Sequence, residues 1–176
     1  MKYLLEHFIN IAYKKIPYVV EYIKELIKEK KILKILEIGT AISYSALHFI
    51  SVDSNIHVDT IERSEEMILE ASKNIDKYDV NKQITLHKGD ALEYPVENLS
   101  GDYDLLFIDA AKAQSQKFFL RYVPLLKENG LIGHNFFQNP NKQSNLCFIC
   151  GQEQSFHKDG KNINDIISID NQENKN

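Results

Sequence analysis

The sequence predicts an α/β protein in which a mostly parallel sheet is covered by helices on both faces. Short and almost wholly apolar segments alternate along the chain with longer segments whose apolar residues recur at helical spacing. Glycine and acidic residues follow the apolar segments, which is where the parallel strands of a doubly wound sheet expose their carboxyl ends.

The bulk composition fits a single globular domain. Of the 176 residues, 43% are hydrophobic and 26% are charged, so a core of ordinary size can form. The net charge of -4 gives no overall attraction for nucleic acid. The first residues mix Lys, Glu and His with apolar side chains, so we expect no signal peptide, and no apolar run is long enough for a membrane span. With only two cysteines, we expect a cytoplasmic protein rather than a disulfide scaffold.

Residues 1–33 predict two helices that pack on the sheet. Apolar residues recur at helical spacing over residues 4–12 and again over residues 19–27, and Pro17 separates the two patterns. Lysines gather after the second helix at Lys28, Lys30, Lys31 and Lys34. They are either contacts for RNA phosphates or a solvated helix face, and interleaved glutamates favour the second interpretation.

Five apolar segments predict the strands, at residues 35–38, 57–61, 84–87, 103–108 and 131–132. Helices are expected after the first, second and fourth strands. Ser64 is a suitable N-cap for the second of these helices, and the third extends through Leu126 with Pro124 disturbing its last turn. Right-handed crossovers then give a doubly wound, Rossmann-like sheet in the order 3-2-1-4-5.

The stretch from Lys34 to Ser45 is expected to form the functional centre. Its strand ends at Gly39, where the backbone can approach a ligand, and the free N–H groups at the start of the next helix suit an anionic group. Glu62 ends the second strand, about 20 residues after the glycine turn, where a carboxylate can bind a ribose.

Four segments, ILEIGTAISYS, TIERS, GDALE and FIDAAK, resemble in order and spacing the class I S-adenosylmethionine-dependent O-methyltransferases. The resemblance runs from Tyr18 to Ile132. It is strongest to the small bacterial branch of the catechol and caffeoyl-CoA O-methyltransferase group, which includes tRNA 5-hydroxyuridine methyltransferases. It implies a methyltransferase domain over residues 1–135, with its Rossmann-like core over residues 34–135, and a homodimer.

The same resemblance implies a binding site for S-adenosylmethionine. Gly39 would approach the methionine part, Ser45 would hydrogen-bond its carboxylate, and Glu62 would hold both ribose hydroxyls. Asp90 and Ala91 would lie by the adenine. The implied cofactor residues are Glu37, Gly39, Ala41, Ser43, Tyr44, Ser45, Glu62, Arg63, Asp90, Ala91 and Asp109.

Ser43 departs from the family pattern, which has glycine at this position. If the position requires a positive φ or a close contact, a serine there costs about 1 kcal/mol or more. We therefore expect weakened cofactor binding.

The catalytic residues implied by the resemblance are Asp109 and Lys112. In the family the aspartate binds a divalent cation, usually Mg²⁺, and the lysine acts as general base. An Asp-Asn pair supplies the other metal ligands, and here His134 and Asn135 stand in its place. An imidazole suits transition metals better than Mg²⁺, so a site of Asp109, Asn135 and His134 should bind Mg²⁺ weakly.

Residues 136–176 form a divergent polar tail in place of the family's last two strands. Either the tail is disordered or residues 146–150 and 163–169 supply short strands. Cys147 and Cys150 could bind zinc with His134 and His157, but the spacing matches no standard module, so we interpret them as part of a short apolar segment.

Two functional hypotheses follow. The first is an O-methyltransferase that acts on a hydroxyl of a modified tRNA uridine or of a small catechol-like molecule. The alternative is a truncated or frameshifted chain that at most binds the cofactor and catalyses nothing.

Overall fold

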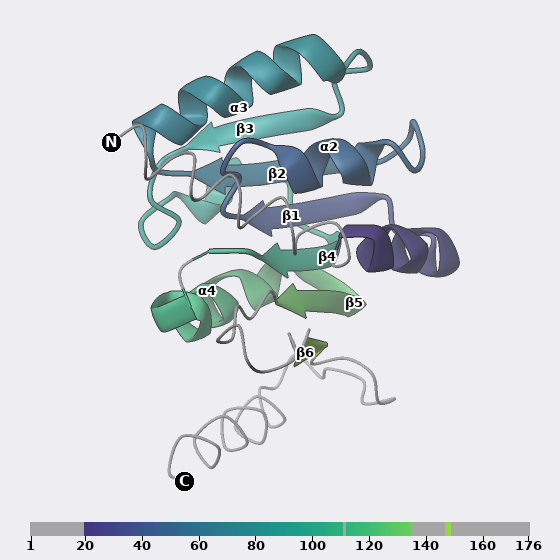
Figure 1. The fold of residues 1–176 in the computed structure, drawn as a ribbon. Coiled ribbons are helices and arrows are strands. Elements are labelled where there is room, and N and C mark those ends of the chain that lie inside the picture. The colour runs from purple at the N-terminus through teal and green to yellow at the C-terminus, as the bar shows by residue number, and fades with distance from the viewer. Residues whose placement is uncertain (1–19, 111, 135–146, 149–176) are drawn as a thin grey trace, which may run out of the picture.

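The computed structural model describes residues 20–110, 112–134 and 147–148, which form one sheet with helices on both faces (Figure 1). After helical residues 20–30, the elements are β1 (Lys34–Ile38), α2 (Tyr44–Ile50), β2 (His57–Glu62), α3 (Glu65–Tyr78), β3 (Ile84–Lys88), β4 (Tyr103–Ile108), α4 (Ser115–Tyr122), β5 (Leu126–His134) and β6 (Cys147–Phe148). Short 3-10 turns lie at Val96–Asn98, Lys112–Gln114 and Val123–Leu125. No helix in these ranges has the length and apolar character that a membrane span requires.

The sheet has the order β3-β2-β1-β4-β5-β6. Strands β1 to β5 are parallel to their neighbours, so the predicted fold class and the order 3-2-1-4-5 are confirmed. Strand β6 pairs antiparallel with β5 and lies within the segment 146–150, one of the two considered as short strands. The other segment, 163–169, and the first predicted helix lie outside the described residues.

Strand β5 begins earlier than the sequence predicts. Leu126 was expected at the end of a helix, but it pairs with Tyr103 of β4 and is buried. The next pairing joins Leu105 to Leu131, so residues 127–130 form a bulge in the ladder, with Asn129 at a φ of 68°. Pro124 ends the helical pattern. Leu126 joins the strand because its side chain packs in the apolar core on this face of the sheet.

Alternate residues of the strands build two apolar cores, one on each face of the sheet. On β1, Ile35 belongs to the core beneath residues 20–30 and α2, whereas Leu36 and Ile38 belong to the core beneath α4. Because both faces are covered, the central strands are almost wholly buried.

Gly39 brings the end of β1 against the end of β4. Its φ is 98°, and its N–H donates to the carbonyl of Ile61 at 3.0 Å. A Cβ atom at this position would lie 2.7 Å from the carbonyl oxygen of Asp109. Both the backbone conformation and the lack of space therefore require glycine here.

Replacing Gly39 with alanine should destabilise the fold by about 3 kcal/mol, because a positive φ and a backbone clash add together. Gly101→Ala is the matched control, since Gly101 has a φ of 65° but a Cβ there would meet nothing within 4 Å. We expect that control to cost only about 1 kcal/mol. Urea unfolding measures both changes, and equal losses would contradict the role of close packing at Gly39.

Candidate functional site

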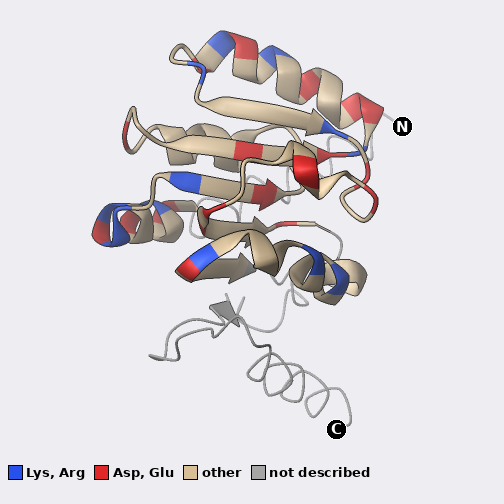
Figure 2. Cartoon of the chain, turned by 180° about the vertical axis from the view of Figure 1, so that it is seen from behind, with Lys and Arg blue, Asp and Glu red and all other residues tan. Residues whose placement is uncertain are grey.

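The predicted cofactor residues converge on the edge where the parallel strands end. Glu37 and Gly39 lie at the end of β1, Glu62 ends β2, Asp90 follows β3, and Asp109 follows β4. Figure 2 shows acidic residues at the ends of β1 and β2 on this edge. Residues from four separate parts of the sequence are thus brought to one side of the sheet, as expected for a doubly wound fold.

The Glu62 carboxylate connects the end of β2 to the glycine turn. Its Oε2 accepts from the N–H of Ala41 at 2.9 Å, and its Oε1 accepts from the N–H groups of Arg63 and Ser64, each at 2.9 Å. A carboxylate offers about four acceptor positions, so about one remains for a ligand. Glu62 is therefore held in a defined orientation and keeps some capacity to bind.

Glu37 is a fully buried carboxyl group surrounded by hydroxyls. Ser45 Oγ donates to its Oε1, Thr60 Oγ1 donates to its Oε2 at 2.6 Å, and Thr40 Oγ1 lies 2.6 Å from Thr60 Oγ1. Burial raises the pKa of Glu37 to about 8, opposed by these hydroxyls and reinforced by the nearby charges of Asp109 and Glu62. Glu37 is therefore mostly uncharged at neutral pH.

This arrangement gives Ser45 a partner that the sequence analysis did not anticipate. Its hydroxyl hydrogen points to Glu37, and its expected contact with a ligand carboxylate stays a prediction. Thr60 was also missed as a site residue. Thr60 lies opposite Glu37 in the pairing of β1 with β2, which brings the two side chains together. The sequence offered one signal for such a partner, namely Glu37 itself, an acid within an apolar strand.

Ser43 has the backbone conformation that favours glycine. Its φ is 69° and ψ is 22°, in the left-handed region, so the condition stated for this position is met. The side chain is fully buried and makes no capping hydrogen bond to α2. Among the residues that the structure describes, its Oγ has no hydrogen-bond partner. The residue is therefore strained and also carries an unsatisfied polar atom.

Others of the predicted cofactor residues lie at the start of α2 and in the segment after β3. The rings of Tyr44 and His48 lie 4.4 Å apart at the start of α2. Asp90 accepts from Leu92 N–H at 2.9 Å and from the Arg63 guanidinium at 3.1 Å. The backbone bond and then the guanidinium lower the pKa of Asp90 against the opposing effect of burial. It remains ionised in a fixed position.

The catalytic half of the site is described only in part. Asp109 directly follows β4, and the backbone of His134 pairs with that of Ile108, so both lie at the same edge. The side chains of Lys112 and His134 and all of Asn135 lie outside the described residues. Among the described side chains, no three His, Cys, Asp or Glu residues form a metal cluster. The metal ligands and the base therefore stay predictions.

A cavity of about 620 Å³ lies at the opposite edge, where the strands begin. Its walls include Lys34, His57, Asp104 and Lys127. None of the predicted cofactor residues lines it, so it is distinct from the candidate cofactor site. Asp104 is already occupied there, accepting from Lys127 Nζ at 2.6 Å and from the N–H groups of Leu33 and Lys34 at 2.9 Å.

Comparison with known families agrees with the fold. A profile of the O-methyltransferase family matches residues 15–139. The chain belongs to the O-methyltransferase family.

Two curated relatives are similar over part of their length. The O-methyltransferase ankF of Aspergillus thermomutatus is 30% identical over 112 residues, which are 62% of this chain and 45% of the relative. A catechol O-methyltransferase of Niastella koreensis is 31% identical over 102 residues, which are 56% of this chain and 46% of the relative. The chain thus spans about half the length of these relatives.

Solved structures share the fold. A protein from Staphylococcus aureus described as a caffeoyl-CoA O-methyltransferase has a TM-score of 0.65 and 43% identity, covering 74% of this chain and 64% of its own. An O-methyltransferase from Bacillus cereus, in complex with SAH, has a TM-score of 0.63 and 28% identity. The match covers 68% of this chain and 56% of that protein.

Replacing Glu37 with glutamine should change how stability depends on pH. The pKa of Glu37 is raised from 4.5 to about 8 in the folded chain, so the folded state binds this proton more tightly than the unfolded state. The stabilisation is complete below the unfolded pKa and is lost as the pH rises through about 8. Relative to the wild type, Glu37→Gln should therefore gain stability as the pH rises.

Urea unfolding at several pH values across this range measures the difference. Glu93→Gln, a change at an exposed glutamate, serves as the control and should follow the wild type. Parallel curves for Glu37→Gln and the wild type would contradict the raised pKa.

Ser43→Gly should stabilise the chain by about 1 kcal/mol, because it removes the left-handed serine and the unsatisfied hydroxyl at some cost in unfolded-state entropy. Ser51→Gly is the control, since Ser51 has a φ of -67° and its hydroxyl donates to the carbonyl of His48. That variant should lose stability. A melting temperature that falls in both variants would show that Ser43 is not strained.

Proposed function

We propose that this chain binds S-adenosylmethionine and transfers its methyl group to a hydroxyl. The observation that carries the proposal is the hydrogen bond from the N–H of Ala41 to Glu62, which joins the glycine turn of β1 to the acid that ends β2. A Podospora anserina methyltransferase in the SAH-bound state, 29% identical over 65% of this chain, supports it as a structural relative.

The cofactor would lie along the edge where the strands end. The turn at Gly39 lets its methionine part come close to the backbone, with Ser45 and Tyr44 beside it. The acceptor position left on Glu62 suits a ribose hydroxyl. Asp90 and Ala91 follow β3 and would face the adenine. Family membership and the convergence of these positions on one edge support this arrangement.

The proposed reaction is an in-line displacement. A bond forms between the acceptor oxygen and the methyl carbon while the carbon–sulfur bond breaks, and the sulfonium becomes the neutral thioether of S-adenosylhomocysteine. Lys112 would take the hydroxyl proton as general base. Asp109 and Asn135, with His134, would hold a divalent cation, which when bound lowers the pKa of an acceptor hydroxyl.

The acceptor is either a small catechol-like molecule or a modified tRNA uridine. The Niastella relative, a catechol O-methyltransferase, favours the first. The net charge of -4 gives no general attraction to RNA, which also favours the small molecule.

Cofactor binding without catalysis is the second candidate function. It is favoured by the position of His134, which stands at the end of β5 where the resemblance expects a carboxylate ligand. A chain that kept the cofactor site and lost the metal ligands would bind S-adenosylmethionine and leave acceptors unmethylated.

Calorimetric titration of the chain with S-adenosylmethionine, with and without Mg²⁺, tests the proposal. We expect micromolar binding that does not depend on the metal. Glu62→Gln should weaken it by about tenfold through loss of a charged acceptor, whereas Glu66→Gln, a change at an exposed residue of α3, should not. No binding by a folded sample would contradict the proposal.

Formation of S-adenosylhomocysteine in the presence of catechol or of tRNA separates the two candidate functions. If S-adenosylhomocysteine forms only when catechol is present, the chain is an enzyme with a small-molecule acceptor. If it forms only when tRNA is present, the acceptor is RNA. Binding of the cofactor without product from either would favour the chain that only binds.

A further inference from the structure

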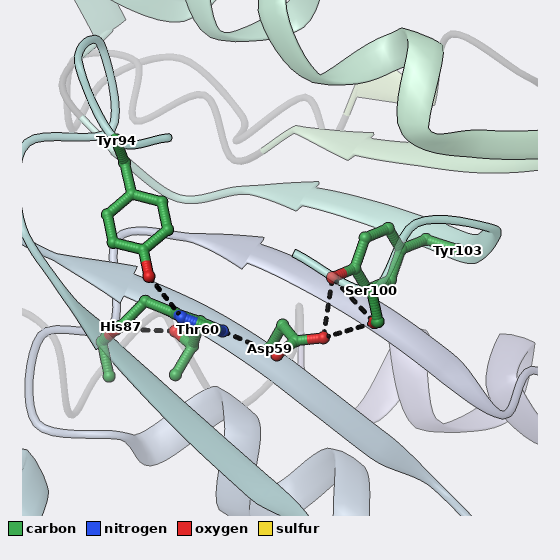
Figure 3. A network of polar contacts seen from close by, with 7 residues as sticks. Asp59, Thr60, His87, Tyr94, Ser100 and Tyr103 are labelled. Atoms are coloured by element: carbon green, nitrogen blue, oxygen red, sulfur yellow. Dashed lines mark hydrogen bonds and ion pairs between the residues drawn. The ribbon is translucent and has the colours of Figure 1, made fainter. Parts of the chain in front are cut away.

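A chain of hydrogen bonds runs from the middle of β2 to the segment that follows β3. His87 Nε2 lies 2.7 Å from Asp59 Oδ1, and His87 Nδ1 lies 2.8 Å from Tyr94 Oη. Figure 3 shows the three side chains in a row, with Ser100 and Tyr103 meeting Asp59 from the other side. The Asp59 and His87 side chains are 15% and 11% exposed, and both line the cavity at the edge where the strands begin.

The polarity of these bonds follows from Asp59. Burial raises the pKa of Asp59, but hydrogen bonds from His87, Tyr103 and Ser100 outweigh it and hold the pKa below its ordinary value. As a carboxylate Asp59 only accepts, so His87 Nε2 donates the hydrogen bond to it, and the other ring nitrogen, Nδ1, meets the Tyr94 hydroxyl. Each side chain of this hydrogen-bonded row therefore holds the next in one orientation.

Tyr94 is also fixed through its backbone and its ring. The Arg121 guanidinium donates to the Tyr94 carbonyl at 2.7 Å, and Tyr122 Oη donates to the Ala91 carbonyl at 2.6 Å. A Cβ on Gly89 would lie 3.2 Å from the Tyr94 ring, so the ring packs against the backbone just before Asp90. Residues 90–94 are thus held between β3 on one side and α4 on the other.

We propose that Asp59, His87 and Tyr94 are positioning residues that set the place of Asp90 and Ala91 for recognition of the adenine base. The inference rests on the proposed binding of S-adenosylmethionine. None of the three side chains needs to touch the cofactor. They act by fixing the backbone of residues 90–94. Their loss should therefore reduce discrimination between bases more than it reduces the affinity for the rest of the cofactor.

Tyr94→Phe tests this role, because it removes one hydroxyl and keeps the ring that packs on Gly89. Ser100→Ala is the control. Ser100 Oγ lies 3.0 Å from Asp59 Oδ2 and 3.2 Å from Tyr103 Oη, so this change also removes a hydroxyl from the network, at the end farthest from Asp90. A merely structural role predicts similar effects of both variants on ligand binding.

The readout is base discrimination, measured by calorimetry with S-adenosylhomocysteine and with S-inosylhomocysteine, which carries an oxygen in place of the adenine amino group. We expect the wild type to prefer the adenine ligand, Tyr94→Phe to lose roughly fivefold of that preference, and Ser100→Ala to keep it. His87→Gln should behave as Tyr94→Phe does, and it decides the question if circular dichroism shows that Tyr94→Phe does not fold.

The outcomes separate this inference from the proposed function. Failure of the folded wild type to bind S-adenosylhomocysteine overturns both. Binding by the wild type with no base preference, or with a preference that Tyr94→Phe and His87→Gln both retain, overturns only the positioning role. Equal loss of preference in Ser100→Ala would show general loosening of the network and would also overturn it.

Discussion

The approach of β1 to β4 at Gly39 is the constraint on which the rest of the candidate site depends. A side chain at this position would collide with the backbone at Asp109, so only glycine allows the two central strands to end side by side. The turn that follows then brings the N–H of Ala41 to the carboxylate of Glu62. The ends of β1, β2 and β4 are thus joined at the glycine turn by backbone hydrogen bonds and by the Glu62 carboxylate.

The two acids nearest this turn have opposite environments. Glu62 accepts from three backbone N–H groups, which fix the orientation of its carboxylate. Glu37 is enclosed by hydroxyls, and burial raises its pKa to about 8, so the neutral form dominates at neutral pH. One edge of the sheet therefore holds one acid fixed by backbone N–H groups and another buried among hydroxyls.

Much of the fold could be predicted because its signals are local. The apolar runs and the glycine turn lie within a few residues of each other, and the strand order follows from parallel crossovers. The start of β5 could not be predicted in this way. Leu126 has the spacing of a helix, and only its contact with a strand distant in the sequence places it in the ladder.

The sequence by itself determined the class of fold, the edge on which the chemistry gathers, and the identity of Gly39, Glu62 and Asp90 as residues of that edge. These follow from the alternation of elements and from residue types at strand ends. Only the tertiary structure showed that Thr60 meets Glu37, that Ser43 is strained, and that Tyr94 is linked to Asp59. The contacts of Thr60 and Tyr94 depend on strand register and on packing between residues far apart in the sequence, which no local pattern specifies. The conformation of Ser43 is set by the turn between β1 and α2.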